Sequence, residues 1–322
     1  MFFSLPRSSG SPPAGGFGEA RLPLSTLSEF PEPPLSKQSV DHVRRKYLKL
    51  LHEHTGRNVI AYYSGFLSKP DAPSEINDED KNGFMMAVHQ LDRKLGLDII
   101  LHTPGGGIAA VQSLLNYLHK MFNENMRAIV PQIAMSAGTM LACSCKSILM
   151  AKHSNLGPID PHLRGVPAYG VIEEFERACK EVKDDPSKTQ MWQAIIGQYK
   201  PTFLGQCQNA IKWSNEFVQK ELVNVMFKGM PDAVQRAKKI VKQLTDYTAN
   251  RTHERHISSE ECKDMGLVIE EIEADQILQD RLLTVHHCYM LSLMNTGSYK
   301  MIENHMGIAF VKQQGTVAIP VQ

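Results

Sequence analysis

The sequence has almost no net charge, which argues against a nucleic-acid-binding function. Its 35 basic and 34 acidic residues give a formal net charge of +1. A chain with this balance lacks the long-range positive field that draws proteins to DNA, RNA or an anionic membrane. We therefore expect no nucleic-acid partner.

Cysteine patterns typical of disulfide frameworks or metal sites are also missing. The six cysteines form no CxxC pair, and a chain of 322 residues can bury a large core without disulfides. Cys143 and Cys145 have no second pair that would complete a tetrahedral metal site. We therefore expect reduced thiols and no metal. Four histidines without carboxylates at ligand spacing are interpreted as surface or core residues: His253, His256, His286 and His287.

The sequence has no apolar run typical of a signal peptide or a membrane span. Phe2, Phe3 and Leu5 are followed by prolines and glycines instead of an apolar segment. Residues 128–145 carry no charge but include proline, glycine, glutamine, serine and threonine, so we interpret them as a buried strand, a turn and a core helix. The sequence predicts a cytoplasmic protein whose membrane contact is at most peripheral.

Proline and glycine mark the domain organisation. Residues 1–36 hold seven of the 18 prolines and few large aliphatic side chains, so they are predicted to be a disordered tail. Residues 37–322 are predicted to form one domain. Within it, the segment from about 170 to 250 has aromatic and aliphatic residues at helical spacings, which indicates a helical insertion or extension.

Four predicted strands alternate with helices between residues 58 and 151. The strands are expected at residues 58–63, 97–102, 127–131 and 147–151. The connections are long enough for parallel pairing, which indicates an α/β fold with a parallel sheet covered by helices. Ligands of such sheets bind beyond the carboxyl ends of the strands.

Two glycine-containing turns fall at that edge of the predicted sheet. Residues 103–107 read TPGGG, a turn whose backbone N–H groups no side chain obstructs, as an oxyanion hole requires. Ser136 lies between a predicted strand and a helix N-terminus, beside the small residues Ala137 and Gly138. The positive end of that helix would stabilise a developing alkoxide at Ser136.

Taken together, the motifs HTPGG, AMSAGTMLACSC and SNLGPIDP, in this order, resemble the Clp-protease/crotonase superfamily. The sequence is most similar to the serine dehydrogenase proteinase group, which is related to signal peptide peptidase A (protease IV). The resemblance covers about residues 55–310, including the segment HISSEECKDMGL at 256–267. Despite the family name, TPGGG is not the GxGxxG fingerprint of a dinucleotide site, so no cofactor is expected.

The resemblance implies a serine-type endopeptidase that hydrolyses peptide bonds through an acyl-enzyme on Ser136. It implies that the N–H groups of Gly106 and Ala137 form the oxyanion hole, with Gly105 permitting the turn. It also implies a peptide or protein substrate and assembly into a homo-oligomer. Asp160 is interpreted as a structural residue that bonds turn amides near the site.

Two residues are candidates for the general base. Lys183 lies 47 residues after Ser136, in a Lys-Asp context that resembles the protease IV group, and we predict a Ser–Lys dyad. A lysine can accept a proton at neutral pH only if burial or a nearby cation lowers its pKa. His162 lies 26 residues after Ser136, at a spacing similar to that of Clp-type enzymes, and is the alternative base.

Two other functions share the same fold. A crotonase-type acyl-CoA hydratase or isomerase would use the oxyanion hole with a glutamate as acid and base, and would leave Ser136 without a role. A catalytically inactive scaffold would keep the fold and the oligomer interface without a base. Both alternatives stay open at the level of the sequence.

Overall fold

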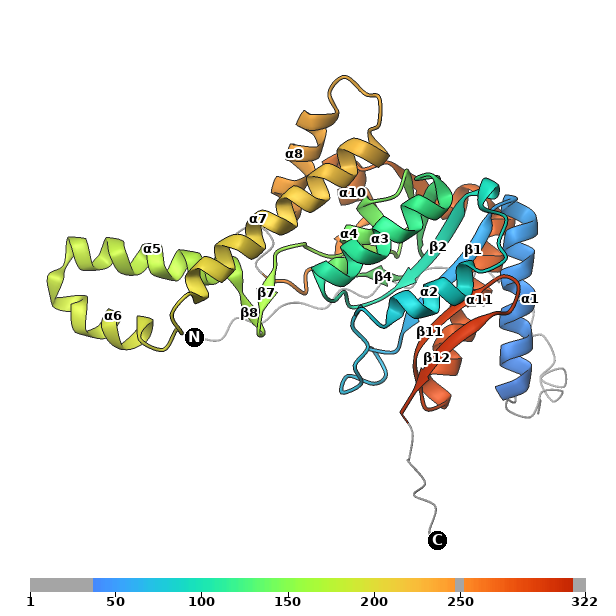
Figure 1. Ribbon diagram of the computed structural model, residues 1–322, viewed down its shortest axis with the longest axis horizontal. Helices are drawn as coiled ribbons and strands as arrows, with labels where there is room; N and C mark the ends of the chain where they lie inside the picture. The colour runs from blue at the N-terminus through green and yellow to red at the C-terminus, as the bar shows by residue number, and fades with distance from the viewer. Residues whose placement is uncertain (1–36, 247–251, 315–322) are drawn as a thin grey trace, which may run out of the picture. The chain divides into compact units, whose positions relative to one another are not determined.

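A seven-stranded, mostly parallel sheet lies at the centre of the computed structural model, which describes residues 37–246 and 252–314 (Figure 1). The tail predicted for residues 1–36 and the last part of the predicted helical segment, residues 247–251, lie outside the described residues. The order of the strands across the sheet is β10-β5-β3-β2-β1-β11-β12. The strands are β1 (Asn58–Ser64), β2 (Leu97–His102), β3 (Met126–Val130), β5 (Ser147–Met150), β10 (Ile269–Glu271), β11 (Ser298–Asn304) and β12 (Ala309–Gln313).

The parallel part of the sheet confirms the fold class predicted from the sequence. Strands β1, β2, β3, β5 and β10 pair in parallel, and β1, β2, β3 and β5 agree within one residue with the four predicted strands. Strand β11 runs antiparallel to both β1 and β12. No sequence pattern indicated this antiparallel hairpin.

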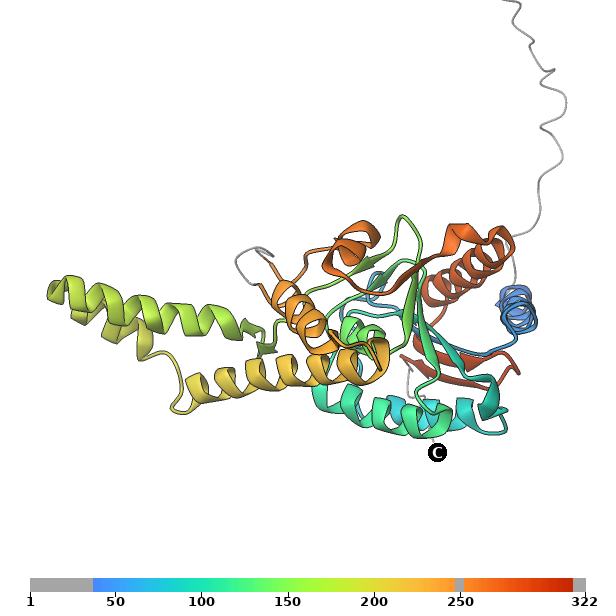
Figure 2. The ribbon, with the colours of Figure 1, turned by 90° about the horizontal axis from the view of Figure 1, so that it is seen from above.

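Both faces of the sheet are buried under helices. Alternate residues of β1 point to opposite faces, as a strand requires, so that Ile60 and Tyr62 join one core and Val59, Ala61 and Tyr63 join the other. Figure 2 shows the two layers of helices, with α2 and α3 on one face and α11 on the other. The layers consist of α1 (Lys37–Thr55) and α11 (Gln276–Asn295) on one side, and of α2 (Asp80–Val88), α3 (Ile108–Phe122) and α4 (Ala137–Cys143) on the other.

The predicted helical insertion forms a series of helices after the fourth strand of the parallel sheet. Its members are α5 (Ala168–Asp184), α6 (Thr189–Ile196), α7 (Phe203–Glu221) and α8 (Ala233–Leu244). Helix α7 connects two cores: Phe217 and Val218 pack in the main core, while Phe203 and Cys207 form a smaller core with α5. Figures 1 and 2 both show α5 and α6 extending away from the central sheet. In the described part of the chain, no helix is both long and apolar enough to cross a membrane.

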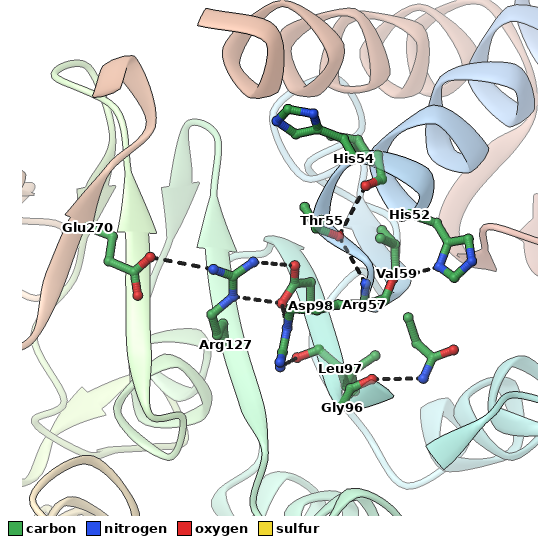
Figure 3. A network of polar contacts seen from close by, with 12 residues as sticks. His52, His54, Thr55, Arg57, Val59, Gly96, Leu97, Asp98, Arg127 and Glu270 are labelled. Atoms are coloured by element: carbon green, nitrogen blue, oxygen red, sulfur yellow. Dashed lines mark hydrogen bonds and ion pairs between the residues drawn. The ribbon is translucent and has the colours of Figure 1, made fainter. Parts of the chain in front are cut away.

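A buried carboxylate joins the strands at the edge of the sheet where β2 begins (Figure 3). The Asp98 side chain is fully buried and accepts hydrogen bonds from Arg57 Nε at 2.5 Å and from Arg127 Nε and Nη2 at 2.9 and 2.7 Å. Arg127 also reaches the exposed carboxylate of Glu270 on β10 at 3.5 Å. The parallel register places Asp98 beside Arg127, so this ion-pair network joins β2 and β3 at the end of β2 opposite the TPGGG turn.

We predict that Asp98→Ala lowers the free energy of unfolding by about 3 kcal/mol, because it leaves two partly buried guanidinium groups without their shared carboxylate. The matched control is Glu270→Ala, which removes an exposed partner of the same network and is expected to cost less than about 1 kcal/mol. Urea denaturation of both variants measures the difference. Equal losses in the two variants would contradict the assignment of Asp98 as the centre of the network.

Candidate active site

Ser136 occupies a sharp turn between a strand and a helix. Strand β4 (Ile133–Ala134) precedes it and α4 begins at the next residue. Its backbone angles, φ 50° and ψ −115°, are rarely adopted by residues other than glycine and are typical of a nucleophile exposed on a tight strand-to-helix turn. Strain of this kind persists only where the surrounding structure imposes it. The serine is half-buried and lines a pocket of about 700 Å³.

The TPGGG turn lies directly against Ser136. Thr103 forms a parallel bridge with Ala134, and the Met135 N–H donates to the Thr103 carbonyl at 3.0 Å. A Cβ atom at Gly105 would lie only 2.7 Å from the Cβ of Ser136, and φ at Gly105 is +102°, so this position requires glycine.

A bridge with Ile76 orients the Gly106 peptide. The Ile76 N–H donates to the Gly105 carbonyl at 2.7 Å, and the Gly107 N–H donates to the Ile76 carbonyl at 3.0 Å. In a parallel bridge the residue between two such bonds points its own N–H and C=O groups away from the partner strand. The N–H and C=O groups of Gly106 therefore point away from Ile76, and Gly106 lines the same pocket as Ser136.

Ala137 supplies a second backbone N–H next to the nucleophile. It is the first residue of α4, and the N–H groups of a first helical turn have no acceptor within their own helix. A Cβ atom at Gly105 would lie 3.0 Å from the Ala137 nitrogen, so this N–H lies beside the glycine turn. The two predicted oxyanion donors, Gly106 and Ala137, therefore each directly follow one of the two residues in contact, Gly105 and Ser136.

Asp160 connects two histidines at the same pocket. Its side chain is only 3% exposed and accepts hydrogen bonds from His253 Nδ1 at 2.8 Å and from His162 Nε2 at 3.3 Å. Both histidines line the pocket with Ser136, and their side chains are 29% exposed for His162 and 23% for His253. We expected Asp160 to bond turn amides; among the described residues its carboxylate instead accepts hydrogen bonds from two imidazoles.

Local pairing positions the Asp160 segment relative to the serine. Thr139, one turn along α4 from Ser136, exchanges hydrogen bonds with the backbone of Gly157 at 2.9 and 3.0 Å. The Ser214 hydroxyl on α7 donates to the Ile159 carbonyl at 2.9 Å. His162 then lies on β7 (His162–Leu163), which pairs with β8 (Val166–Pro167) in a tight hairpin. These contacts come from elements separate in sequence.

The hydrogen bonds of Asp160 outweigh the effect of its burial. Burial raises the pKa of a carboxyl group, but the bonds from His162 and His253 lower it, and the net pKa of Asp160 lies well below its ordinary value. Asp160 therefore carries a negative charge beside the two imidazoles.

These three side chains also form a donor set of the kind that divalent cations use. Each of the three side chains offers one ligand atom, and these atoms all lie within 4.8 Å of one another. Each imidazole already bonds a different oxygen of Asp160, and the ring centroids lie 4.2 Å apart with planes at 37°. This geometry suits a carboxylate that orients two histidines.

Lys183 is not brought to this site. It is exposed near the C-terminal end of α5 and is not among the residues that line the pocket of Ser136. Figures 1 and 2 show α5 running away from α4 toward that end. The described chain therefore brings the alternative base, His162, to the pocket of Ser136 and leaves Lys183 on a distant helix. His253, interpreted from the sequence as a surface or core residue, belongs to the site.

The pairing of His253 with Asp160 had no usable signal in the sequence. The two residues are 93 positions apart, with the helices of the insertion between them. The two residues share only a position in the chain, since His253 lies shortly before the segment at 256–267 where the core resumes. In the structure this segment contributes β9 (Ile257–Ser258), which pairs with β6 (Asn155–Leu156) just before Asp160.

A parallel α/β sheet with a strained serine between strand and helix, facing a glycine turn, defines a ClpP-like fold with a serine-hydrolase type of site. The chain matches the family model described as "ClpP-like SDH-type serine proteinase" over residues 30–279, and it belongs to this family.

Two archaeal proteins are similar to the chain. The uncharacterized protein MJ0137 of Methanocaldococcus jannaschii is 27% identical over 227 residues, which cover 70% of each chain. The uncharacterized protein MJ1495 of the same organism is 28% identical over 194 residues, which are 60% of this chain and 59% of that protein. Neither relative therefore specifies a substrate.

We predict that replacing Asp160 by asparagine destabilises the protein in a pH-dependent way. Because the pKa of Asp160 is lower in the folded protein than the ~3.9 of an unfolded chain, its contribution is fully present above about pH 4 and is lost as the pH falls through the folded pKa. The difference in unfolding free energy between wild type and Asp160→Asn should therefore shrink between pH 6 and pH 3. Urea denaturation at both values tests this, and an unchanged difference would refute it.

Proposed function

We propose that the protein is a serine-type endopeptidase that cleaves peptide bonds through an acyl-enzyme on Ser136. The observation that carries the proposal is the contact of the strained Ser136 turn with the glycine loop at Gly105, in a pocket that also holds two histidines. Membership in a family of serine proteinases supports the same reaction class. The substrate is proposed to be a peptide or protein, and the working form a homo-oligomer.

The oxyanion hole consists of the N–H groups of Gly106 and Ala137. When the Ser136 Oγ attacks the scissile carbonyl carbon, the carbonyl oxygen becomes negatively charged and accepts hydrogen bonds from both groups. Such fixed donors stabilise the transition state more than the substrate, and each donor contributes about 10²–10³-fold to kcat. The N-terminus of α4 adds its partial positive charge at the same place.

The general base is proposed to be His253, held by Asp160. A carboxylate that accepts the Nδ1–H bond of a histidine leaves Nε2 unprotonated and able to accept the hydroxyl proton. His253 presents Nδ1 to Asp160 at 2.8 Å, whereas His162 presents Nε2 at the longer distance of 3.3 Å. Lys183, the base of the predicted Ser–Lys dyad, does not line the pocket of Ser136 within a single chain.

The proton balance of the reaction follows from these roles. His253 takes the Ser136 hydroxyl proton as the Oγ–carbon bond forms, and the charge of Asp160 stabilises the resulting imidazolium. His253 then gives this proton to the departing amine as the peptide C–N bond breaks. In the second half, His253 takes a proton from the attacking water and returns it to Ser136 Oγ as the ester bond breaks.

The pocket offers an apolar wall for a substrate side chain. Ile108 on α3, Met140 on α4 and Trp213 on α7 line it, and the indole of Trp213 is held by a hydrogen bond from Nε1 to Gln112 Oε1 at 3.2 Å. Trp213 is 42% exposed, so it is accessible to a ligand. A pocket with this lining suits an uncharged peptide side chain.

A crotonase-type hydratase is the second candidate, because the exposed Glu75 lines the same pocket and could serve as the acid and base of such an enzyme. The peptidase is favoured because a hydratase has no use for a strained, accessible serine flanked by histidines. A fluorophosphonate probe separates the two functions, since only an activated serine reacts with it, and a measurement of coenzyme A affinity tests the hydratase.

We predict that a fluorophosphonate labels the wild-type protein on Ser136 and that Ser136→Ala abolishes both labelling and peptidase activity. The loss of activity should be at least about 10³-fold, because the covalent step is removed. Circular dichroism and light scattering serve as controls for fold and assembly, which should not change. Full peptidase activity of the purified Ser136→Ala variant would end the proposal.

A second kinetic experiment tests the base. His253→Gln should lower kcat/KM by about 10²–10⁴-fold, the range typical of general-base catalysis, while Lys183→Ala keeps the wild-type activity. The pH dependence of the wild-type kcat/KM separates the two kinds of base, because the ordinary pKa of histidine is ~6.5 whereas a lysine base gives a rise above neutrality.

The outcomes of this experiment distinguish the three candidates for the general base. An inactive His162→Gln beside an active His253→Gln would move the role to His162. An inactive Lys183→Ala with a rise above neutrality would restore the Ser–Lys dyad, with the lysine supplied by a neighbouring subunit.

A further inference from the structure

A buried ion pair lies outside the lining of the substrate pocket. Lys300 on β11 and Asp80 at the start of α2 are both fully buried, and Lys300 Nζ lies 2.9 Å from each Asp80 oxygen. The Tyr62 hydroxyl on β1 donates to Asp80 Oδ2 at 2.9 Å. Two opposite charges are rarely taken out of water together unless additional hydrogen bonds satisfy them.

The ion pair holds the segment that bridges to the glycine turn. Lys300 Nζ donates a further hydrogen bond to the Glu75 carbonyl at 2.7 Å, and the Asn77 N–H donates to Asp80 Oδ2 at 3.0 Å. The two bonds therefore lie on either side of Ile76. A further bond holds the residue before Glu75, because the Ser64 hydroxyl donates to the Ser74 carbonyl at 2.8 Å.

Ile76 connects this held segment to the proposed oxyanion hole. Its N–H and carbonyl groups bond Gly105 and Gly107, at 2.7 and 3.0 Å, and thereby set the direction in which the Gly106 N–H points. The contact is close, because a Cβ atom at Gly106 would lie 2.3 Å from the Ile76 carbonyl oxygen. A shift of Ile76 cannot occur without a shift of the Gly106 peptide.

We infer that Lys300 and Asp80 are positioning residues that fix the Gly106 N–H in the orientation needed for an oxyanion, by way of Glu75, Ile76 and Asn77. This inference rests on the proposed function. Neither side chain lines the substrate pocket. Their role is therefore to lower the transition-state energy through the backbone of the glycine turn, with little effect on substrate binding.

The test is Lys300→Met in the full-length protein, with hydrogen–deuterium exchange and kinetics measured together. The amides of residues 74–78 and 103–108 should exchange about tenfold faster, because the bonds that hold Ile76 are lost. The rate of fluorophosphonate labelling and kcat should fall by about 10²-fold, with KM changed less than about twofold, because a misplaced donor affects the transition state.

A matched control uses a second buried ion pair, between Arg44 of α1 and the same strand β11. Arg44 is 1% exposed and pairs with the buried Glu303 of β11 at 2.7 Å, with Tyr289 as a further partner of Glu303 at 3.0 Å. Arg44→Met therefore also removes a buried cation from a carboxylate, although Glu303 keeps Arg45 Nε at 2.8 Å. Within the described residues, this pair has no bond to residues 74–78 or 103–108. It should lower stability while leaving exchange at the glycine turn and the labelling rate unchanged.

A second variant covers the case in which Lys300→Met does not fold. The double change Asp80→Asn with Lys300→Met leaves no buried charge unpaired and still removes the donor to the Glu75 carbonyl, so the same changes in exchange and labelling are expected. Exchange and labelling indistinguishable from those of Arg44→Met would overturn the inference while the proposed function stands. A wild type that the probe does not label would reject the proposed function. Faster exchange at the glycine turn in Lys300→Met would then still show that Lys300 and Asp80 hold that turn in place.

Discussion

The contact between Gly105 and Ser136 is the constraint on which the rest of the site depends. Two backbone segments approach each other so closely there that no side chain fits at Gly105 and the serine must adopt a positive φ angle. Neither segment would hold this geometry alone. The serine turn is fixed by β4 pairing with Thr103 and by α4, and the glycine turn is fixed by its bridge with Ile76. Strain at this point is thus balanced by hydrogen bonds on both sides.

Three buried carboxylates, Asp98, Asp80 and Asp160, each bond basic side chains in a different part of the molecule. Asp98 neutralises two arginines at the far end of the parallel strands, where it stabilises the sheet without reaching the pocket. Lys300 and Asp80 bond the segment that bridges to the glycine turn, and Asp160 bonds two histidines that line the pocket. Each carboxylate has at least two donors, as expected for charge that is removed from water. Of these three groups, the one at Asp160 bonds histidines that line the pocket of Ser136.

Local patterns in the sequence were sufficient for the parallel sheet and for the two turns. Strand burial on both faces is encoded by continuous apolar runs, and the glycine turn and the serine turn have compositions that restrict them to few conformations. No local pattern in the sequence indicates which distant residues support these turns. Lys300 meets Asp80 across 220 residues and His253 meets Asp160 across 93, and a lone histidine or lysine has no pattern that indicates its partner. The base therefore could not be assigned from spacing, and Lys183 was favoured on a family resemblance.

The central claim is that Ser136, two backbone N–H groups and His253 act on one carbonyl group. A crystal structure of the protein after reaction with a peptidyl phosphonate tests it directly. The account predicts a covalent bond from phosphorus to Ser136 Oγ, a phosphonyl oxygen about 2.7–3.1 Å from the nitrogens of both Gly106 and Ala137, and His253 Nε2 within hydrogen-bond reach of Oγ. A phosphonate attached to another residue, or an oxygen directed away from both backbone nitrogens, would contradict it.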